Sequence, residues 1–264
     1  MPAGTDTSEA RIEVRDLTMA FGDFVVMRDL NFIVRRGDIF VVMGGSGCGK
    51  STLLRHMIGL LEPARGEILY EGVSFTRAST EERQLMLRRF GVTYQSGALW
   101  SSMTLAENVG LPLDEFTDLS DGEIRAIATL KLALVGLKGF EDYYPSQISG
   151  GMQKRAALAR AMALDPDVLF FDEPSAGLDP ISTRLLNELI IELRDSLGAT
   201  IMVVTHDLAS IFMIANNSVF LDGISRRMIA QGDPRELRDH CDIPAVQRFL
   251  RPSFEGRAEA PTDG

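Results

Sequence analysis

The sequence has few of the features that mark secreted, membrane-spanning or strongly basic proteins. Among 264 residues it has two cysteines, Cys48 and Cys241, which are too few for a disulfide framework. No apolar run approaches the ~20 residues that a transmembrane helix needs. Residues 1–11 lack the apolar centre of a signal peptide. The net charge of −10 argues against a protein that holds nucleic acid mainly through a basic surface. We therefore expect a cytoplasmic protein with no nucleic-acid partner.

The rest of the composition is that of an ordinary globular protein. Hydrophobic residues make up 45% of the chain and charged residues 24%. A chain of 264 residues can enclose one large hydrophobic core or two smaller ones. Both cysteines are expected to be reduced thiols, although the position of Cys48 near a cationic site could activate it. The function must therefore be sought in the motifs.

One stretch combines a strand, a glycine-rich loop and the start of a helix. The apolar residues 39–43 precede the pattern G-x-x-x-x-G-K-[ST], here Gly44-Gly45-Ser46-Gly47-Cys48-Gly49-Lys50-Ser51, and Thr52 follows. The glycines let backbone N–H groups turn toward phosphates, and side chains at Gly44, Gly47 and Gly49 would collide with a nucleotide. The helix that begins near Lys50 adds free N–H groups. Lys50 can reach the β- and γ-phosphates, and the Ser51 hydroxyl can bind Mg²⁺. A simple glycine-rich turn would not account for the whole pattern and both flanks.

Apolar runs predict an α/β fold. The runs at 168–172 and 200–204 are continuously apolar, as in strands of a buried parallel sheet. Few strand signals occur between residues 96 and 157, which predicts a helical insertion, and Ser120 and Glu123 have the spacing of a capping box in it. The predicted strands are 12–19, 31–35, 67–70, 91–95, 168–172, 200–204, 219–222 and 228–231. The predicted helices are 50–61, 81–89, 104–109, 121–134, 149–161, 181–197 and 208–215.

Acidic residues end one of the buried strands. Asp172 completes the run 168–172, where it suits the outer shell of a Mg²⁺ ion beside the phosphate loop. Glu173 follows and points elsewhere, so it can act as general base on an attacking water. The alternative is an ordinary strand-end turn. The nearby phosphate loop favours the catalytic interpretation.

Two further polar residues are candidates because of where they lie. His206 follows the buried strand 200–204, whereas His56 and His240 are interpreted as structural. Gln95 ends the predicted strand 91–95 at the edge of the insertion. There it could touch Mg²⁺ or water and transmit the presence of the γ-phosphate to the insertion. Its alternative role is that of a solvent-exposed glutamine.

Further motifs in chain order support a family resemblance. They are Ser149-Gly150-Gly151-Met152-Gln153, Phe171-Asp172-Glu173-Pro174, Ser175-Ala176-Gly177-Leu178-Asp179 and Thr205-His206-Asp207. At these motifs the chain resembles the ATPase subunit of ABC transporters, over residues 12 to about 237. The resemblance implies a P-loop NTPase (RecA-like) core with a parallel sheet, an antiparallel β edge and an inserted helical subdomain. It implies an ATPase domain at 11–240 with the insertion at about 96–157. We expect residues 1–10 to form a flexible tail and 241–264 a C-terminal extension with a disordered end.

The resemblance also implies ATP and Mg²⁺ as cofactors and assigns roles. Ser51, Gln95 and Asp172 would bind the metal, and His206 would contact the γ-phosphate and position the water and Glu173. Phe21 would stack on adenine. The alternative for Phe21 is a core position, with Phe24 as a competitor for the stacking role.

A head-to-tail dimer is part of the same resemblance. Ser149 is a predicted helix N-cap, and Gly150 and Gly151 expose that helix end to an anion. Each ATP would be held by the phosphate loop of one chain and the Ser149 element of the other, with Asp179 at the interface. ATP would close the dimer, and hydrolysis would release it.

Short segments are similar to one subgroup, the ATPases of Mla/Mce-type lipid transport systems. They are Ser-Gly-Gly-Met from Ser149 with the Lys-Arg that follows, residues 94–100 and residues 245–250. The implied partners are an MlaE-like permease, an Mce-domain lipid-binding protein and a small STAS-type subunit. Residues 96–103 would help to receive the permease, or form a buried loop, and residues 245–250 would pack on a partner. The chain departs from the common signature Leu-Ser-Gly-Gly-Gln at Ile148 and Met152, which removes a polar contact near the nucleotide.

Two other interpretations remain open from the sequence. An importer or exporter ATPase for amino acids, ions or drugs would use the same chemistry with another permease. A soluble ATPase assembly module would work on nucleic acid or a cofactor scaffold, and the acidic composition disfavours the nucleic-acid version. In the favoured interpretation the chain is peripheral on the cytoplasmic face of the inner membrane.

Overall fold

The computed structural model describes residues 10–251. Apart from Ala10 and Arg251, the predicted N-terminal tail and the predicted disordered end lie outside these residues. The elements in chain order are β1 (Ala10–Phe21), β2 (Phe24–Arg35), β3 (Ile39–Gly44), α1 (Lys50–Met57), β4 (Arg65–Tyr70), β5 (Val73–Ser74), α2 (Thr80–Leu87), β6 (Phe90–Thr93), α3 (Leu105–Phe116), α4 (Asp121–Leu134), the 3-10 turn η2 (Pro145–Gln147), α5 (Gly150–Ala161), β7 (Val168–Asp172), α6 (Pro180–Leu197), β8 (Thr200–Val204), α7 (Leu208–Ile214), β9 (Asn217–Asp222), β10 (Arg227–Gln231), α8 (Pro234–His240) and α9 (Pro244–Leu250).

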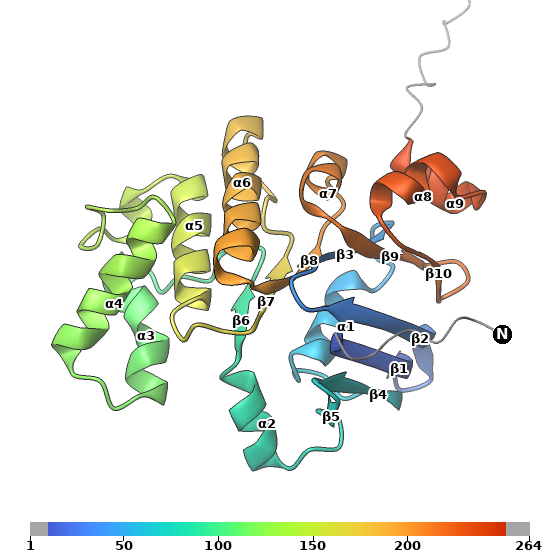
Figure 1. Ribbon diagram of the computed structural model, residues 1–264, viewed down its shortest axis with the longest axis horizontal. Helices are drawn as coiled ribbons and strands as arrows, with labels where there is room; N and C mark the ends of the chain where they lie inside the picture. Colours follow the sequence, from blue (N-terminus) through green and yellow to red (C-terminus); the bar gives the residue numbers. More distant parts are fainter. Residues whose placement is uncertain (1–9, 252–264) are drawn as a thin grey trace, which may run out of the picture.

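Two sheets form the frame of the molecule (Figure 1). The central sheet has the order β10-β9-β3-β8-β7-β6, in which β9 to β6 are parallel and β10 is antiparallel to β9. The second sheet has the order β2-β1-β4-β5 and is antiparallel throughout. The predicted parallel core with an antiparallel edge is therefore confirmed.

The central sheet separates two hydrophobic clusters. Along β3, Phe40 faces one side and Val41 the other, and the neighbouring residues Phe170 and Phe171 of β7 divide in the same way. Phe40 and Phe170 belong to one cluster, with residues of α1 and of the antiparallel sheet. Val41 and Phe171 belong to the other cluster, with residues of α3, α4, α5, α6, α7 and α9. Helices α1 and α5 thus cover opposite faces of the central sheet.

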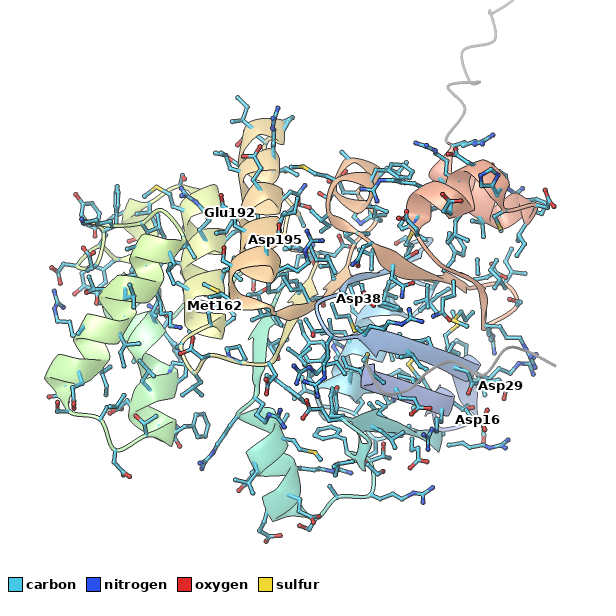
Figure 2. The ribbon with its side chains drawn as sticks, in the orientation of Figure 1. Asp16, Asp29, Asp38, Met162, Glu192 and Asp195 are labelled. Atoms are coloured by element: carbon cyan, nitrogen blue, oxygen red, sulfur yellow. The ribbon has the colours of Figure 1, made fainter. Side chains whose placement is uncertain are left out.

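An irregular pairing bends the antiparallel sheet. The register of β1 with β2 shifts between Val14 and Leu17, and both Asp16 and Asp29 have left-handed backbones with φ of 46° and 55°. Asn31 holds this bulge, since it accepts a bond from the Asp16 amide and donates to the Asp29 carbonyl. Asp16 and Asp29 lie together at the outer end of this sheet (Figure 2).

A network of ion pairs joins the two sheets. Glu71, between β4 and β5, accepts hydrogen bonds from Arg11, Arg36 and Arg89. Arg11 and Arg89 also pair with Asp167, which precedes β7. The side chains of Arg11 and Glu71 are 10% and 25% exposed, so this network is partly shielded from solvent.

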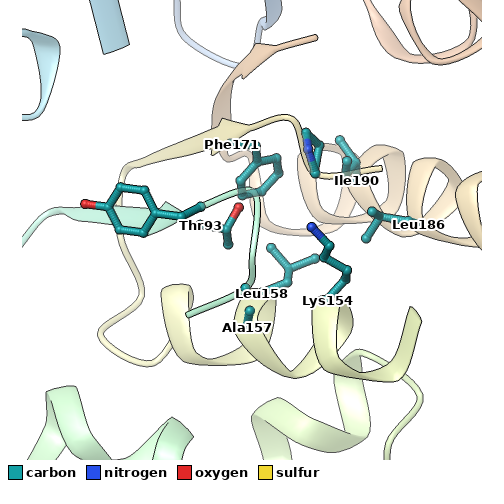
Figure 3. Close-up of a pocket in the computed structure, with 10 residues that line it drawn as sticks. Thr93, Lys154, Ala157, Leu158, Phe171, Leu186 and Ile190 are labelled. Atoms are coloured by element: carbon teal, nitrogen blue, oxygen red, sulfur yellow. The ribbon is translucent and has the colours of Figure 1, made fainter. Parts of the chain in front are cut away.

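The segment between β6 and β7 is mostly helical, and its helix α5 packs closely on the sheet. Ala157 and Leu158 of α5 meet Phe171 of β7 and Leu186 and Ile190 of α6 (Figure 3). The cavity among them measures about 10 Å³, room for one water at most. Helix α5 continues past residue 157, which was the predicted end of the insertion. In residues 10–251 no helix is both long and apolar enough to cross a membrane.

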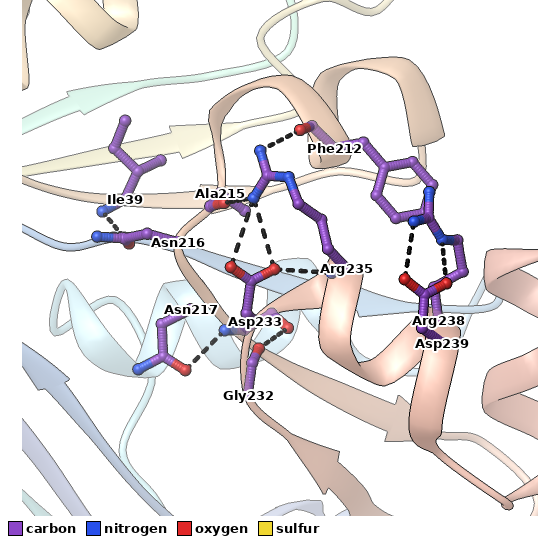
Figure 4. Close-up of polar contacts among 11 residues, drawn as sticks. Ile39, Phe212, Ala215, Asn216, Asn217, Gly232, Asp233, Arg235, Arg238 and Asp239 are labelled. Carbon is purple, nitrogen blue, oxygen red and sulfur yellow. Dashed lines mark hydrogen bonds and ion pairs between the residues drawn. The ribbon is translucent and has the colours of Figure 1, made fainter.

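The C-terminal helices fold back on their own chain. Val246 and Leu250 of α9 are buried in the helical cluster. Arg235 of α8 donates to the carbonyls of Phe212 and Ala215 at the end of α7 (Figure 4). The apolar side of residues 245–250 therefore packs on this chain, and packing of their exposed side on a partner stays a prediction.

Several predicted boundaries were wrong. The helix predicted at 50–61 ends at Met57 because Gly59 turns with a left-handed φ of 75°. The helix predicted at 104–109 continues through Pro112 to Phe116. The strand predicted at 31–35 begins at Phe24.

Candidate active site

The glycine-rich loop leaves the carboxyl end of β3, and its glycines serve two purposes. A Cβ at Gly44 would lie 2.4 Å from the Leu221 carbonyl oxygen, and one at Gly49 would lie 2.8 Å from Val26 Cγ1. At Gly45 and Gly47 a Cβ would meet nothing within 4 Å. Gly44 and Gly49 thus make room for the protein's own backbone and side chains, and their expected role in avoiding a nucleotide stays a prediction.

The start of α1 presents an uncapped helix end. Gly49 is its N-cap residue, with φ of 101°, and no side chain accepts a hydrogen bond from the first turn. This leaves backbone N–H groups free for an anion. Lys50 Nζ donates to the carbonyls of Gly44 and Gly45 at 2.9 and 3.0 Å, which holds the ammonium at the mouth of the loop.

Ser51 and Asp172 meet although they are far apart in sequence. Ser51 Oγ donates to Asp172 Oδ1 at 2.9 Å. Burial raises the pKa of Asp172, and the Ser51 hydrogen bond partly opposes that rise. The pair offers hard oxygen ligands suited to Mg²⁺, with remaining ligands left to phosphates and water. In residues 10–251 no cluster of three or more His, Cys, Asp or Glu forms a separate metal site.

Glu173 and His206 are in direct contact. Glu173 Oε1 lies 2.8 Å from His206 Nδ1, and the Glu173 amide donates to the Val204 carbonyl at the end of β8. Glu173 has a left-handed backbone with φ of 48°, a strained conformation that is common at functional sites. Its side chain is 14% exposed and that of His206 is 68% exposed. A shielded carboxylate that is oriented by an accessible imidazole can accept a proton from a water beside the pair.

Gln95 lies at the same edge of the sheet. The parallel pairing of Thr93 with Phe171 directs the next residues of both strands toward the site. Gln95 is exposed, and its carbonyl accepts a hydrogen bond from Lys154 of α5. Its side chain is therefore free to face a ligand.

Phe21 is on the surface. It is 53% exposed and pairs across the hairpin turn with Phe24. The Phe24 ring is engaged by the Arg226 guanidinium at 4.8 Å, which leaves Phe21 as the ring better placed to stack on a base. The alternative of a core position for Phe21 was wrong.

The other singled-out cysteines and histidines fit structural roles. Cys48 is buried, and burial raises the pKa of its thiol, which argues against an activated thiolate. Cys241 is also a free thiol. His56 is buried with Nδ1 2.8 Å from the Thr52 carbonyl oxygen. His240 lies on the surface of α8 near Glu236.

The Ser149 element begins α5. Ser149 is the N-cap and accepts a bond from the Met152 amide at 3.3 Å. Met152 packs against the helical cluster, so the methionine fills apolar space at the position where the signature has glutamine. Gln153 instead donates to the Pro145 carbonyl at 2.8 Å and braces the preceding turn. Gly150 has open space around it.

Asp179 caps the next helix, α6. It accepts bonds from the amides of Ile181 and Ser182 and from the Ser182 hydroxyl. A Cβ at Gly151 would lie 3.2 Å from Ser182 Oγ. Asp179 and the Ser149 element are therefore neighbours on one surface.

The carboxyl edge of the central sheet thus brings together the loop after β3, the acids after β7, His206 after β8 and Gln95 after β6. Ligands bind at this edge in open α/β sheets. The fold and the loop define a P-loop nucleotide-binding protein. Sequence reasoning missed Lys154 and Arg160, which hold the Gln95 loop, because these contacts join segments about 60 residues apart.

Comparison with known proteins identifies the family. Residues 27–176 match the family model described as ABC transporter. The match covers more than half of the chain, and the chain belongs to the ABC transporter ATP-binding family, a family of ATPases. The resemblance inferred from the motifs is thereby confirmed.

Named relatives align along most of the chain. The intermembrane phospholipid transport system ATP-binding protein MlaF of Haemophilus influenzae is 42% identical over 93% of this chain and 92% of its own length. MlaF of Escherichia coli K12 is 38% identical over 95% and 90%. The probable ribonucleotide transport ATP-binding protein mkl of Mycobacterium tuberculosis is 42% identical over 90% of this chain, which spans 66% of that relative's length.

Solved structures have the same fold. The dimeric ATP-binding cassette MJ0796, bound to ADP and Pi in a post-hydrolysis state, matches with a TM-score of 0.76 and 27% identity. That match covers 84% of this chain and 98% of the other. Clostridium perfringens cbiO1, part of the transporter complex cbiONQ, matches with a TM-score of 0.81 and 27% identity over 92% and 96%.

Proposed function

We propose that this chain is the ATP-hydrolysing subunit of an ABC transporter that drives lipid movement through a separate membrane permease. The observation that carries the proposal is the convergence of Lys50, the Ser51–Asp172 pair and the Glu173–His206 pair at one edge of the sheet. These groups supply a phosphate contact, a metal ligand set and a base with its positioning partner.

ATP would lie over the glycine-rich loop. The free N–H groups of the loop and of α1 would bind the phosphates, Lys50 would bind the β- and γ-phosphates, and Phe21 would cover the base. Mg²⁺ held by Ser51, Asp172 and Gln95 would neutralise charge on the phosphate oxygens. Further backbone contacts to the phosphates would come from four residues of the loop and the first turn of α1: Gly45, Ser46, Cys48 and Thr52.

The hydrolytic step would use Glu173 and His206. Glu173 would accept a proton from water as the water oxygen attacks the γ-phosphorus, and the bond to the β-phosphate oxygen would break. His206, with Nδ1 2.8 Å from Glu173 Oε1, would hold that carboxylate in position and contact the γ-phosphate. The burial of Glu173 beside an accessible histidine supports this division of roles.

A second copy of the chain would complete each site. The loop and α1 pack on one face of the central sheet, and α5, which begins after Ser149, packs on the other. The Ser149-Gly150-Gly151 element is thus free to serve a partner's nucleotide, with Asp179 beside it. The dimeric, ADP-bound structural relative supports a dimer, and its head-to-tail arrangement is part of our proposal.

A groove between α2, β6, α3 and α5 supports a permease contact. It measures about 580 Å³ and is lined by residues that include Leu87, Arg88, Phe116 and Arg160. A cytoplasmic helix of an MlaE-like permease would dock beside it and against Trp100, which is 58% exposed. Of the predicted docking loop, Gly97 is buried while Ala98 and Trp100 are exposed. The chain would then be peripheral on the cytoplasmic face of the inner membrane.

The lipid substrate is proposed from the MlaF relatives, which are named for phospholipid transport. Further partners would be an Mce-domain lipid-binding protein and a small STAS-type subunit. The mycobacterial relatives are named for ribonucleotide transport, so ribonucleotides are a second candidate substrate class.

Purification of the tagged full chain from detergent-solubilised membranes tests the transport proposal. We expect a permease, an Mce-type protein and enriched phospholipid, identified by mass spectrometry. A permease with a soluble-solute binding protein and no enriched lipid would replace lipid by another substrate class. Recovery only from the soluble fraction would contradict a transport role and favour a soluble ATPase module. A mock purification from untagged cells is the control for background lipid.

A further inference from the structure

Three cationic side chains of helix α5 donate hydrogen bonds to backbone carbonyls of other segments. Lys154 donates to the Gln95 carbonyl, and Arg160 donates to the carbonyls of Ala98 and Gly97 at 2.8 and 3.1 Å. Arg155 donates to the Val135 carbonyl at 3.0 Å. In residues 10–251 none of these cations is in an ion pair, so they bind backbone rather than carboxylates.

The loop after β6 is shaped to receive two of these cations. Gly97 and Ala98 are both left-handed, with φ of 75° and 50°. Ala98 is strained in this conformation, which a short loop adopts only when its surroundings require it. Two successive left-handed residues turn their carbonyls toward α5, where Arg160 binds both.

Lys154 occupies a costly position. Burial lowers its pKa, and no charged group offsets that effect. Its side chain rises from α5 toward Thr93 and Phe171 at the ends of β6 and β7 (Figure 3). The half-buried ammonium of Lys154 donates its hydrogen bond to the Gln95 carbonyl, so this contact offsets the cost of burial and restrains Gln95.

We propose that Lys154 and Arg160 are positioning residues that clamp the Gln95 loop to α5, so that Gln95 and the Ser149 element move as one body. The inference rests on the proposed ATPase function. The loop cannot shift along α5 without breaking three cation–carbonyl hydrogen bonds at two points of the helix. Gln95 would touch the nucleotide of its own chain, and Ser149 at the start of α5 would serve the nucleotide of the partner. The clamp therefore links the two ATP sites mechanically.

The test compares full-length variants of Lys154. Lys154→Met keeps the apolar stem and removes the donor, and Lys154→Arg keeps a donor. Lys138→Met removes an exposed cation from the turn that follows α4. We expect kcat of Lys154→Met to fall about tenfold or more, because small displacements of a positioning group cost that much. The Kd for MgATP should change less than about threefold, since Lys154 does not touch the nucleotide. Lys154→Arg should restore kcat, and Lys138→Met should match the wild type.

Trp100 reports the loop directly, because it is the only tryptophan and follows Ala98 closely. We expect MgATP to shift its emission in wild type and Lys154→Arg, and this shift to be lost in Lys154→Met. An unchanged kcat or an equal emission shift in Lys154→Met would overturn the clamp, as would an equal loss of kcat in Lys154→Arg. If Lys154→Met does not fold by thermal melting, Lys154→Leu, which also has no donor, carries the same expectations. A wild-type chain that neither binds nor hydrolyses ATP would instead refute the proposed ATPase function.

Discussion

At the scale of single residues, Lys50 combines burial with the proposed role of binding phosphate. Only 8% of the residue is exposed, and its ammonium is held by the carbonyls of Gly44 and Gly45. In the ATP complex the ammonium would instead donate to phosphate oxygens, whose negative charge strengthens these hydrogen bonds.

Lys50→Ala should weaken ATP binding by about 2 kcal/mol, which is roughly 30-fold in Kd. The lost interaction is a hydrogen bond between charged groups in a site that largely excludes water. Isothermal titration calorimetry with MgATP measures the change. Lys138→Ala, which removes an exposed ammonium, is the control and should bind as the wild type does. An unchanged Kd in Lys50→Ala would show that the loop does not hold the phosphates.

Individual site residues were predictable when chemistry and position coincided. Asp172 and Glu173 follow an apolar run, and the structure places both at the sheet edge. The roles of Lys154 and Arg160 could not be predicted, since each depends on which carbonyl a distant loop turns toward it. The packing roles of Gly44 and Gly49 were hidden for the same reason, because Leu221 and Val26 meet them only in the folded chain.

At the scale of elements, Glu71 connects the two sheets. Burial by itself raises the pKa of Glu71, but the hydrogen bond from Arg89 and the charges of Arg11 and Arg36 outweigh it and hold the pKa below its ordinary value. The folded-state pKa is thus lower than the unfolded-state pKa of about 4.3. The stability contributed by the Glu71 carboxylate is therefore present above about pH 4.3 and is lost as the pH falls through the folded-state pKa.

Glu71→Gln should lower the free energy of unfolding by about 1–3 kcal/mol at pH 7, because three guanidinium groups lose a partner. The difference from wild type should shrink as the pH falls below about 4. Urea unfolding of both proteins at pH 7 and at a pH below about 4 measures this difference in the free energy of unfolding. Glu62→Gln, which breaks a pair with a 62% exposed carboxylate, is the control, with an expected loss of about 0.5 kcal/mol or less. Equal losses in both variants would contradict a special role for Glu71.

Helices and strands were predicted correctly where the hydrophobic pattern of the sequence was unbroken. The strands at 168–172 and 200–204 and the helix at 121–134 have the predicted bounds. The first half of β2 was missed because Arg28 and Asp29 are consecutive polar residues at a left-handed bend, which breaks the alternation. The second half of α3 was missed because Pro112 normally ends a helix, whereas here contacts with α4 and α5 maintain it.

At the scale of the whole molecule, the proposed division of each ATP site between two chains has a measurable consequence. If Glu173 is the base, Glu173→Gln should bind ATP and fail to turn it over, with kcat lowered about 10²- to 10⁴-fold. The dimer closed by ATP would then persist. Size-exclusion chromatography with light scattering, with and without MgATP, measures the dimer.

Glu192→Gln supplies the matched control, since Glu192 is an exposed residue of α6 (Figure 2). It should hydrolyse ATP and show no lasting dimer. Rapid hydrolysis by Glu173→Gln would exclude Glu173 as the base. Full loss of turnover without an ATP-dependent dimer would leave the base in place and contradict the proposed closure.

The opposite packing of α1 and α5 on the central sheet bears on inheritance. Each chain would contribute a glycine-rich loop to one site and a Ser149 element to the other. A cell that makes both normal and Glu173→Gln chains would assemble mixed dimers. In each mixed dimer the inactive chain would hold a normal chain in a closed dimer. An allele of this kind would therefore be dominant, even though the normal gene product is still made in full.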